Sequence, residues 1–460
     1  MNVTFAGAAR EVTGSCHLVR VGESLVALDC GLFQGHRSEA DRSNRTLPAP
    51  TARITAIVLS HAHIDHAGRI PFLVRDGFRG PIYCTPATRD LSAHMLMDSA
   101  FIQRKDAEHL RRHGRRSIEP LYEADDVART LEQMIGVPYG RTIDVARGVR
   151  ASFVEAGHIL GSASVELDCE ENGVRRRLVF SGDIGRWGLP IIRDPQMPDG
   201  ADTVIMESTY GNRDHDSVQD AREVLASVVT ETAGRGGRIL IPAFAVGRTQ
   251  EILYDLHALA REGSIPQIPI FVDSPLASDV TAVFEMHPDC FDGGEALIQR
   301  TDQLFRFDLV RYTRQVEDSK RLNTLRGPLI IIAASGMAES GRILHHLAHG
   351  ASDPRNTILI VGFQAEHTLG RRIVERRPTI RIFGEDVELR ASVKILNGYS
   401  AHADRTELLR WIEGVSERSP GLRGVHLVHG EPAAQESLAS ELRMRGFAVT
   451  VPARGESVSL

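Results

Sequence analysis

Four side chains able to bind metal are crowded into six residues near the start of the chain, in the segment His61-Ala62-His63-Ile64-Asp65-His66. The apolar run Ile54–Leu59 before this segment predicts a buried strand, and Ala67–Arg75 after it predicts a helix. The segment therefore forms a strand-to-helix loop, in which the first two histidines point to one side and the last two residues reach toward a second ion. Histidine-rich ligation assisted by carboxylates suits zinc best, with manganese as the alternative. A loop with coincidental histidines is a weaker explanation, because buried imidazoles cost desolvation and add no packing.

Length and composition describe an ordinary soluble protein of two or three domains. The chain has 460 residues, 42% of them hydrophobic and 25% charged. The first ten residues lack a basic segment followed by an apolar core, and no apolar run is long enough to span a bilayer, so we expect neither a signal peptide nor membrane contact. Five scattered cysteines without a CxxC pair fit reduced thiols in the cytoplasm. A net charge of −6 argues against a surface that is basic throughout, but it leaves room for a local basic groove.

The order of predicted elements indicates an α/β protein in which one domain interrupts another. Short strand-like runs dominate the first two hundred residues, which is typical of a sheet sandwich with helices on its outer faces. From Asp220 to Gly362 strands and helices alternate, which predicts a parallel, doubly wound sheet. The last part, including a strand expected at Val393–Leu396, resembles the first pattern again. We therefore expect a host domain at 1–208 and 386–460 and an inserted domain at 209–385.

Further aspartates and histidines stand where predicted strands end. Each lies within two residues of a glycine, where such a residue is most often a turn residue. Together with the six-residue segment, however, they can complete two coordination spheres. These strand-end residues are Asp29, His158, Asp183 and His429.

In this order the residues resemble the signature of the metallo-β-lactamase superfamily: a strand-end Asp, then HxHxDH, a lone His, a lone Asp and a late His. The resemblance implies an αββα sandwich with two metal ions, the first held by His61, His63, His158 and Asp183. It implies a second ion held by Asp65, His66, Asp183 and His429, with Asp183 bridging. It also implies that Asp29 orients the ligand histidines.

A narrower resemblance is to the β-CASP nucleases, the branch that includes the cleavage-factor and RNase J-like enzymes. Glu207-Ser-Thr-Tyr-Gly211 is similar to their motif A, and His367 and His402 stand in segments similar to their motifs B and C. Two further family phrases, Ala243–Gln250 and Ala334–Met337, join a strand to a helix, a junction that suits phosphate. The residues expected to contact a substrate phosphate are His367, Ser335, Gly336, Met337 and Arg248.

The expected reaction is hydrolysis of a phosphodiester by a hydroxide that two divalent ions bridge. His402 is the candidate general acid, with Glu207 accepting its other N–H and keeping it charged. Asp65 is a further candidate contact of the attacking water, and Asp183 joins the two ions. In this family DNA-processing members carry valine at the position of His402 and RNA-processing members carry histidine, so the resemblance implies a single-stranded RNA substrate. It also implies products with 5′-phosphate and 3′-hydroxyl ends.

Three alternatives stay open at this point. The enzyme can be an endonuclease, or one that also acts as a 5′-to-3′ exonuclease. It can hydrolyse a small ester, thioester, lactam or phosphodiester, although small-molecule hydrolases of this superfamily lack the insertion. It can be a non-catalytic partner in RNA processing, against which every ligand position is filled. A homodimer is a further partner that the sequence leaves open, and the basic run Arg111–Arg116 is either an RNA contact or a solvated helix end.

Overall fold

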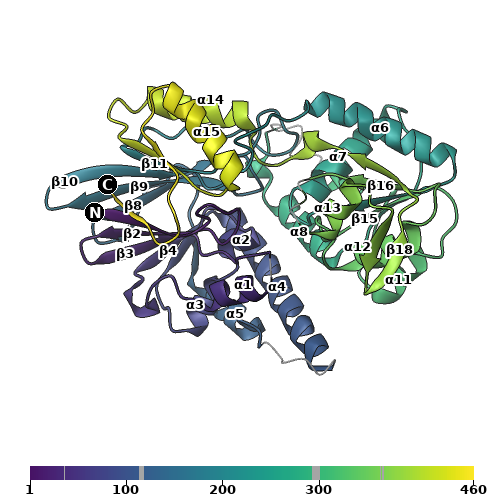
Figure 1. Ribbon diagram of the computed structural model, residues 1–460, viewed down its shortest axis with the longest axis horizontal. Coiled ribbons are helices and arrows are strands. Elements are labelled where there is room, and N and C mark those ends of the chain that lie inside the picture. Colours follow the sequence, from purple (N-terminus) through teal and green to yellow (C-terminus); the bar gives the residue numbers. More distant parts are fainter. Residues whose placement is uncertain (36, 113–118, 293–300, 363, 365–366) are drawn as a thin grey trace. The chain divides into compact units, whose positions relative to one another are not determined.

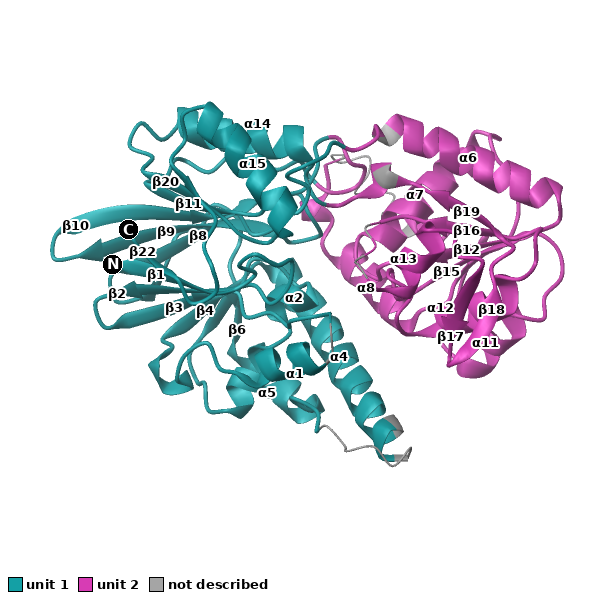
Figure 2. Cartoon of the chain, in the orientation of Figure 1, with its two compact units in different colours: residues 1–187, 193–214, 402–460 teal, residues 188–192, 215–401 magenta. Residues whose placement is uncertain are grey.

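The computed structural model describes residues 1–35, 37–112, 119–292, 301–362, 364 and 367–460. They form two units, shown in different colours in Figure 2. Unit 1 comprises 1–187, 193–214 and 402–460, and unit 2 comprises 188–192 and 215–401. Unit 1 is thus built from separate stretches of chain and is completed by the C-terminal residues.

Unit 1 contains two seven-stranded sheets. In the first sheet, the strands from β3 to β6 run parallel, and the strands before them pair antiparallel. Its order is β22 (Ser457–Ser459), β1 (Asn2–Gly7), β2 (Cys16–Val21), β3 (Ser24–Leu28), β4 (Ala56–Val58), β5 (Ile82–Cys84) and β6 (Met134–Gly136).

The second sheet is parallel at the end that receives the C-terminal strands and antiparallel at the other. The strand β20 pairs in parallel with β11, although the whole of unit 2 separates them in the sequence. The order is β21 (Val449–Thr450), β20 (Gly424–Leu427), β11 (Thr203–Met206), β10 (Val174–Phe180), β9 (Ala163–Glu171), β8 (Val149–Glu155) and β7 (Ile143–Ala146).

The two sheets pack face to face, and helices cover their outer faces (Figure 1). Alternate residues of β1 are buried, so that Val3 and Phe5 meet Phe153 and Phe180 of the second sheet in the central core. On the outside, α3 (Ile70–Arg75), α4 (Pro86–Arg112) and α5 (Ala124–Gln133) pack on the first sheet. The helices α14 (Arg405–Glu417) and α15 (Pro432–Met444) pack on the second. This four-layer arrangement is the αββα sandwich that the sequence predicts.

Unit 2 is built around a six-stranded sheet in which every pairing is parallel. Leu240 packs with α12 on one face, and Ile239 and Ile241 are buried on the other, so both faces of this sheet are covered. The strand order is β14 (Val310–Tyr312), β13 (Ile270–Val272), β15 (Leu329–Ala333), β12 (Arg238–Pro242), β16 (Thr357–Ile360) and β19 (Ser392–Ile395). A hairpin of β17 (Thr379–Ile382) and β18 (Glu385–Glu388) stands beside it. The main helices are α6 (Val218–Gly234), α7 (Arg248–Arg261), α8 (Pro275–Met286), α11 (Val316–Leu322), α12 (Arg342–Gly350) and α13 (Leu369–Val374).

The expectation that Val393–Leu396 belongs to the host domain is wrong. The strand at this place, β19, pairs in parallel with β16 at the edge of the unit 2 sheet. An apolar run of four residues predicts a strand but does not say which sheet it joins. For this reason unit 2 continues to Ala401, whereas the sequence predicts that the insert ends at 385.

The central core of unit 1 contains a histidine, His17 of β2. Its ring is fully buried and packs against Phe5 and Phe180, with centroid distances of 5.6 and 5.3 Å. Neither ring nitrogen has a hydrogen-bond partner among the described residues. Burial, together with the nearby charges of His66 and His429, lowers the pKa of His17 to about 3. His17 is therefore neutral in the folded protein.

We predict that His17→Leu makes unit 1 less sensitive to acid. Between pH 6.5 and about 3 the unfolded chain binds a proton at His17 that the folded protein excludes, so stability falls as the pH decreases through this range. The leucine variant lacks this loss of stability. Its free energy of unfolding, minus that of wild type, should therefore rise by about 1 kcal/mol when the pH is lowered from 6.5 to 5.5. Urea titration of both metal-free proteins at the two pH values measures this difference. A difference that stays constant with pH would contradict the assignment.

Among the described helices, none combines the length and the apolar character that crossing a bilayer requires.

Candidate metal centre

The histidine-rich segment lies between β4 and the short helix α2 (Ile64–Ala67), and neighbouring backbone holds it in place. The loop at residues 30–32 donates two hydrogen bonds to α2, from Cys30 to the carbonyl of His66 and from Leu32 to that of Ile64, at 2.7 and 2.8 Å. A side chain at Gly31 would place its Cβ 1.5 Å from the carbonyl oxygen of Asp65. Glycine is thus required for this close approach, which fixes where Asp65 and His66 point.

Four of the predicted metal ligands converge in a first group, comprising His61, His63, His158 and Asp183. Nδ1 of His63 lies 3.1 Å from Nε2 of His61 and 3.1 Å from Nε2 of His158. Oδ2 of Asp183 lies 3.5 Å from His61 and 3.6 Å from His158. Ligand nitrogens around a tetrahedral zinc ion are about 3.3 Å apart, so the four atoms are spaced as zinc ligands are.

A second group joins Asp65, His66 and His429. The Nε2 atoms of His66 and His429 are 3.1 Å apart, and Nε2 of His429 lies 3.4 Å from Oδ2 of Asp65. Asp183 reaches this group as well, at 3.3 Å from His66 and 3.6 Å from His429. Its carboxylate therefore stands between the two groups, as expected of a bridging ligand.

Asp29 is completely buried beneath the second group and orients its neighbours. Its carboxylate accepts hydrogen bonds from Nδ1 of His66 at 2.7 Å, from the amide of Ser60 at 2.7 Å and from the Ser60 hydroxyl at 2.9 Å. Because the Ser60 hydroxyl donates to Asp29, it accepts from Nδ1 of His61, 3.0 Å away. One carboxylate thus fixes the tautomer of two histidines.

Thr209 plays the same part for His429. Its hydroxyl donates to the carbonyl of His429 and accepts from the ring Nδ1, both at 3.1 Å. Neither Ser60 nor Thr209 is among the site residues predicted from the sequence. Ser60 directly precedes the histidine-rich segment and Thr209 lies within the motif-A phrase, and these positions are the signals that could have found them.

These hydrogen bonds test whether a metal fits. With Nδ1 of His61, His66 and His429 occupied by protons, each Nε2 presents a lone pair. Those of His61 and His66 face Asp183, and that of His429 faces Asp65 and Nε2 of His66. Oδ1 of Asp183 is buried without a hydrogen bond among the described residues. Converging acceptors of this kind repel one another unless a cation lies among them. The residues therefore fit divalent metal ions.

The electrostatics agree with this conclusion. Burial lowers the pKa of His61 well below its usual range and that of His63 to about 4, so both are neutral ligands at pH 7. Burial also opposes charge at His66, but the carboxylates of Asp183 and Asp29 outweigh it and raise its pKa well above the usual range. Positive charge is thus favoured at this position, whether a proton or a metal ion supplies it.

Glu207 and His402 lie beside the first group. Nδ1 of His402 donates to Oε1 of Glu207 at 3.2 Å and lies 3.9 Å from Oδ2 of Asp183. Glu207 is completely buried, and it also accepts the backbone N–H of Ile184 at 2.7 Å. Burial opposes protonation of His402, but the Glu207 carboxylate outweighs it and raises the pKa of His402 to about 9.

The residues expected to contact phosphate lie in unit 2. The turn at Ser335–Met337 is joined to the segment that carries His367: Gln364 donates to the carbonyl of Gly336 at 3.0 Å, and the amide of Gly370 donates to that of Met337 at 3.1 Å. His367 itself is exposed, with φ +69°. The structure thus brings two of the predicted phosphate segments together.

Arg248 has different surroundings from those expected of a phosphate contact. Its side chain is only 6% exposed and forms an ion pair with Glu251 one turn along α7. Its guanidinium also stands 6.0 Å from the ring centre of Tyr399. A partner inside unit 2 thus already takes its charge, and the contact of Arg248 with phosphate stays a prediction. Of the basic run Arg111–Arg116, residues 113–116 lie outside the described residues.

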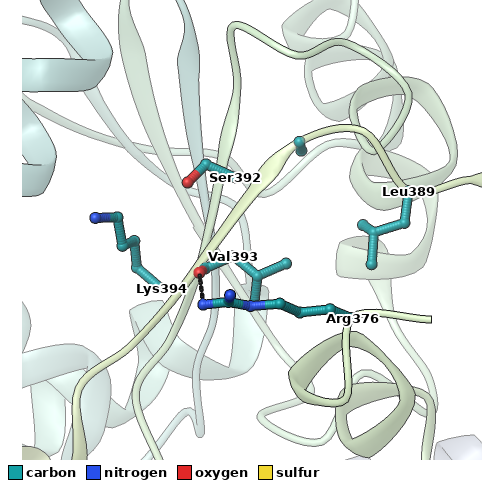
Figure 3. A pocket seen from close by; sticks show the side chains of 6 residues that line it. Arg376, Leu389, Ser392, Val393 and Lys394 are labelled. Carbon is teal, nitrogen blue, oxygen red and sulfur yellow. Dashed lines mark hydrogen bonds between the residues drawn. The ribbon is translucent and has the colours of Figure 1, made fainter. Parts of the chain in front are cut away.

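A hollow of about 400 Å³ opens in unit 2 beside the edge strand β19 (Figure 3). Arg376 and Lys394 line it, and the guanidinium of Arg376 donates to the carbonyl of Val393 at 3.5 Å. No residue predicted to contact phosphate is part of this lining. The hollow is therefore distinct from the segments at Ser335–Met337 and His367.

The sandwich and its histidine–aspartate groups define a metal-dependent hydrolase. Three family models match successive parts of the chain: the metallo-beta-lactamase superfamily at 9–228, the Beta-Casp domain at 249–373 and the Zn-dependent metallo-hydrolase RNA specificity domain at 386–452. The chain belongs to the β-CASP ribonuclease family of the metallo-β-lactamase superfamily.

Its relatives include enzymes and factors that match along most of the chain. Ribonuclease TTHA0252 of Thermus thermophilus is 38% identical over 459 residues, which cover 100% of both chains. Transcription termination factor FttA of Methanosarcina mazei is 32% identical over 455 residues, which cover 96% of this chain and 69% of that protein. A solved structure of a protein of unknown function from Enterococcus faecalis covers 100% of this chain with a TM-score of 0.55 and 13% identity. At that identity the likeness concerns the fold alone.

We predict that Asp29→Asn weakens metal binding although it removes no metal ligand. The amide cannot accept all the hydrogen bonds that orient His66 and Ser60, and losses of this kind typically cost 10- to 100-fold in metal affinity. Metal content after dialysis against a graded series of chelator concentrations measures the effect. Asp168→Asn is the matched control, because Asp168 is a half-exposed carboxylate of β9 that pairs with arginines away from the centre. Equal metal retention by both variants would contradict the role of Asp29.

Proposed function

We propose that this chain, a metal-dependent ribonuclease, cleaves single-stranded RNA internally and leaves 5′-phosphate and 3′-hydroxyl ends. The observation that carries this proposal is the pair Glu207–His402, which places a proton donor 3.9 Å from the carboxylate shared by both metal groups. The relative named as a ribonuclease, similar over its whole length, supports RNA as the substrate.

We propose two zinc ions as the cofactor, with manganese as the alternative. Five imidazole nitrogens and two carboxylates match the ligands that zinc prefers, and Asp183 contributes to both groups. Bound ions supply Lewis acidity, which stabilises negative charge on the phosphate and eases deprotonation of the attacking water.

The residues around the metal ligands complete the reaction. When water attacks phosphorus, the bond to the ribose 3′ oxygen breaks and that oxygen needs a proton. His402 is the candidate donor: Glu207 fixes its Nδ1, leaves Nε2 for the substrate and favours the protonated ring at neutral pH. Burial opposes charge on Asp65, but hydrogen bonding and charge from His429 and His66 outweigh it and lower the pKa of Asp65 to about 2. This carboxylate therefore stays ionised and can accept a hydrogen bond from the attacking water.

A cytoplasmic location is proposed as well, and five free, buried cysteines support it. The homodimer stays a prediction.

His402→Ala should retain metal and lose cleavage by a factor of 100 to 10,000, the usual contribution of a general acid. Incubation of 5′-labelled and 3′-labelled RNA with wild type and variant, alongside metal analysis, checks both parts. Internal fragments with 5′-phosphate ends are expected from wild type. Mononucleotides alone would contradict endonuclease action, and loss of metal from the variant would contradict the role of His402. A chromogenic lactam or ester assayed in parallel tests the alternative of a small-molecule hydrolase.

His367→Ala should raise the KM for RNA about tenfold and change kcat less, because a residue that holds phosphate contributes mainly to binding. Steady-state cleavage of a short labelled RNA measures both parameters. His349→Ala is the matched control, since His349 is an exposed histidine of α12 in the same unit. An unchanged KM for His367→Ala would remove His367 from the phosphate contacts.

A further inference from the structure

The chain passes from unit 2 to unit 1 for the last time between Ala401 and His402. The proposed general acid is thus the first residue after this crossing. Tyr399, three residues earlier, ends the short 3₁₀ helix η3 (Asn397–Tyr399), which still belongs to unit 2. Only Ser400 and Ala401 separate the two side chains along the sequence.

Tyr399 is firmly held inside unit 2. Its side chain is 2% exposed, and its hydroxyl donates to Oδ2 of Asp255 on α7 at 2.6 Å. Beside it, a side chain at Gly398 would bring a Cβ within 2.5 Å of the Ala221 side chain, so η3 also lies directly against α6. The guanidinium of Arg248 faces the Tyr399 ring, which gives this buried arginine a packing role.

His402 is held equally firmly inside unit 1. It forms an antiparallel bridge with Gly185, and the next residue, Ala403, donates to the carbonyl of Ile184 at 2.7 Å. The amide of Ile184 donates in turn to Glu207, the carboxylate that holds the His402 ring. Displacement of the backbone at His402 would therefore disturb the Glu207–His402 bond.

Chain geometry connects the two anchors. Three residues of extended chain span at most about 11 Å, so the place of Tyr399 limits the positions open to His402. If Tyr399 is released, the segment before His402 gains several free backbone dihedrals, and the imidazole becomes less well oriented. Small losses of orientation in a catalytic group cost large factors in rate.

We propose that Tyr399, held by Asp255, is a positioning residue for the proton-donating imidazole of His402. This inference rests on the proposed function of His402 as general acid. A purely structural role explains the pair less well, because burying a hydroxyl and a carboxylate costs free energy that an apolar pair would avoid. Asp255 is 4% exposed and Tyr399 2%, and this burial raises the pKa of both groups.

The test compares two RNA substrates that differ in their need for a proton. In ordinary RNA the P–O3′ bond breaks and the leaving oxygen takes the proton of His402, while water forms the new bond to phosphorus. In an RNA with a single 3′-S-phosphorothiolate linkage, the P–S bond breaks and the thiolate leaves without needing a proton. Defects in proton donation therefore slow cleavage of the first substrate selectively.

Tyr399→Phe, which removes only the hydroxyl, should lower kcat on ordinary RNA about tenfold, with KM and the rate on the thio-substituted RNA within about twofold of wild type. Asp255→Ala should show the same selective loss. Asp255→Asn keeps an acceptor oxygen, so its kcat on ordinary RNA should stay within about threefold of wild type. Tyr312→Phe is the matched control, because Tyr312 is another partly buried tyrosine of unit 2, whose hydroxyl donates to the carbonyl of Phe305 at 2.8 Å. It should match wild type on both substrates.

Two results would overturn the inference: ordinary RNA cleaved by Tyr399→Phe at the wild-type rate, or equal losses on both substrates. His402→Ala separates this failure from that of the proposed function. If His402→Ala shows the selective loss and Tyr399→Phe does not, the assignment of His402 as general acid is correct and its positioning by Tyr399 is wrong. If His402→Ala loses both substrates equally, the assignment of His402 as the acid is itself wrong.

Discussion

The site depends on one buried carboxylate. Asp183 lies within 4 Å of five imidazoles, from His61, His66, His158, His402 and His429, and it is 2% exposed. Burial favours the neutral acid, but the surrounding imidazoles outweigh it and hold the pKa of Asp183 well below its usual range. The carboxylate of Asp183 therefore stays ionised, and the five imidazoles surround its negative charge. Without this charge the histidines would have no common centre, since they come from four separate segments of the chain.

Backbone packing makes this arrangement rigid. A side chain at Gly185 would place its Cβ 1.8 Å from the carbonyl oxygen of Gly157, and the amide of Gly185 donates to Ala156 at 2.8 Å. The loop that carries Asp183 therefore lies directly on the loop that carries His158. Because interlocked loops leave little room for rearrangement, ligand distances are set by the fold before any ion binds, which favours tight and selective metal binding.

Much of this could be predicted from the sequence, for physical reasons that particular residues illustrate. His61 to His66 are adjacent in the chain, so their common site follows from local spacing alone. Asp183 and His429 could be assigned only because the order of the elements resembles a known family. Arg248 was predicted to face phosphate because it opens a helix after a strand, but pattern does not reveal that Glu251 takes its charge. The strand β19 shows the same limit, since four apolar residues do not specify their sheet. The supporting contacts of Ser60 and Thr209 depend on distances between segments, which no spacing in the sequence encodes.

The pairing of β20 with β11 also bears on when the enzyme becomes active during its synthesis. The strand that ends just before His429 joins a sheet begun more than two hundred residues earlier, and His402 too follows the whole of unit 2. A ribosome-bound chain that has emerged as far as unit 2 carries the six earlier metal residues but neither His429 nor His402. Domains fold as their residues emerge, so the hydrolytic centre can be assembled only after the whole of unit 2 has been synthesised.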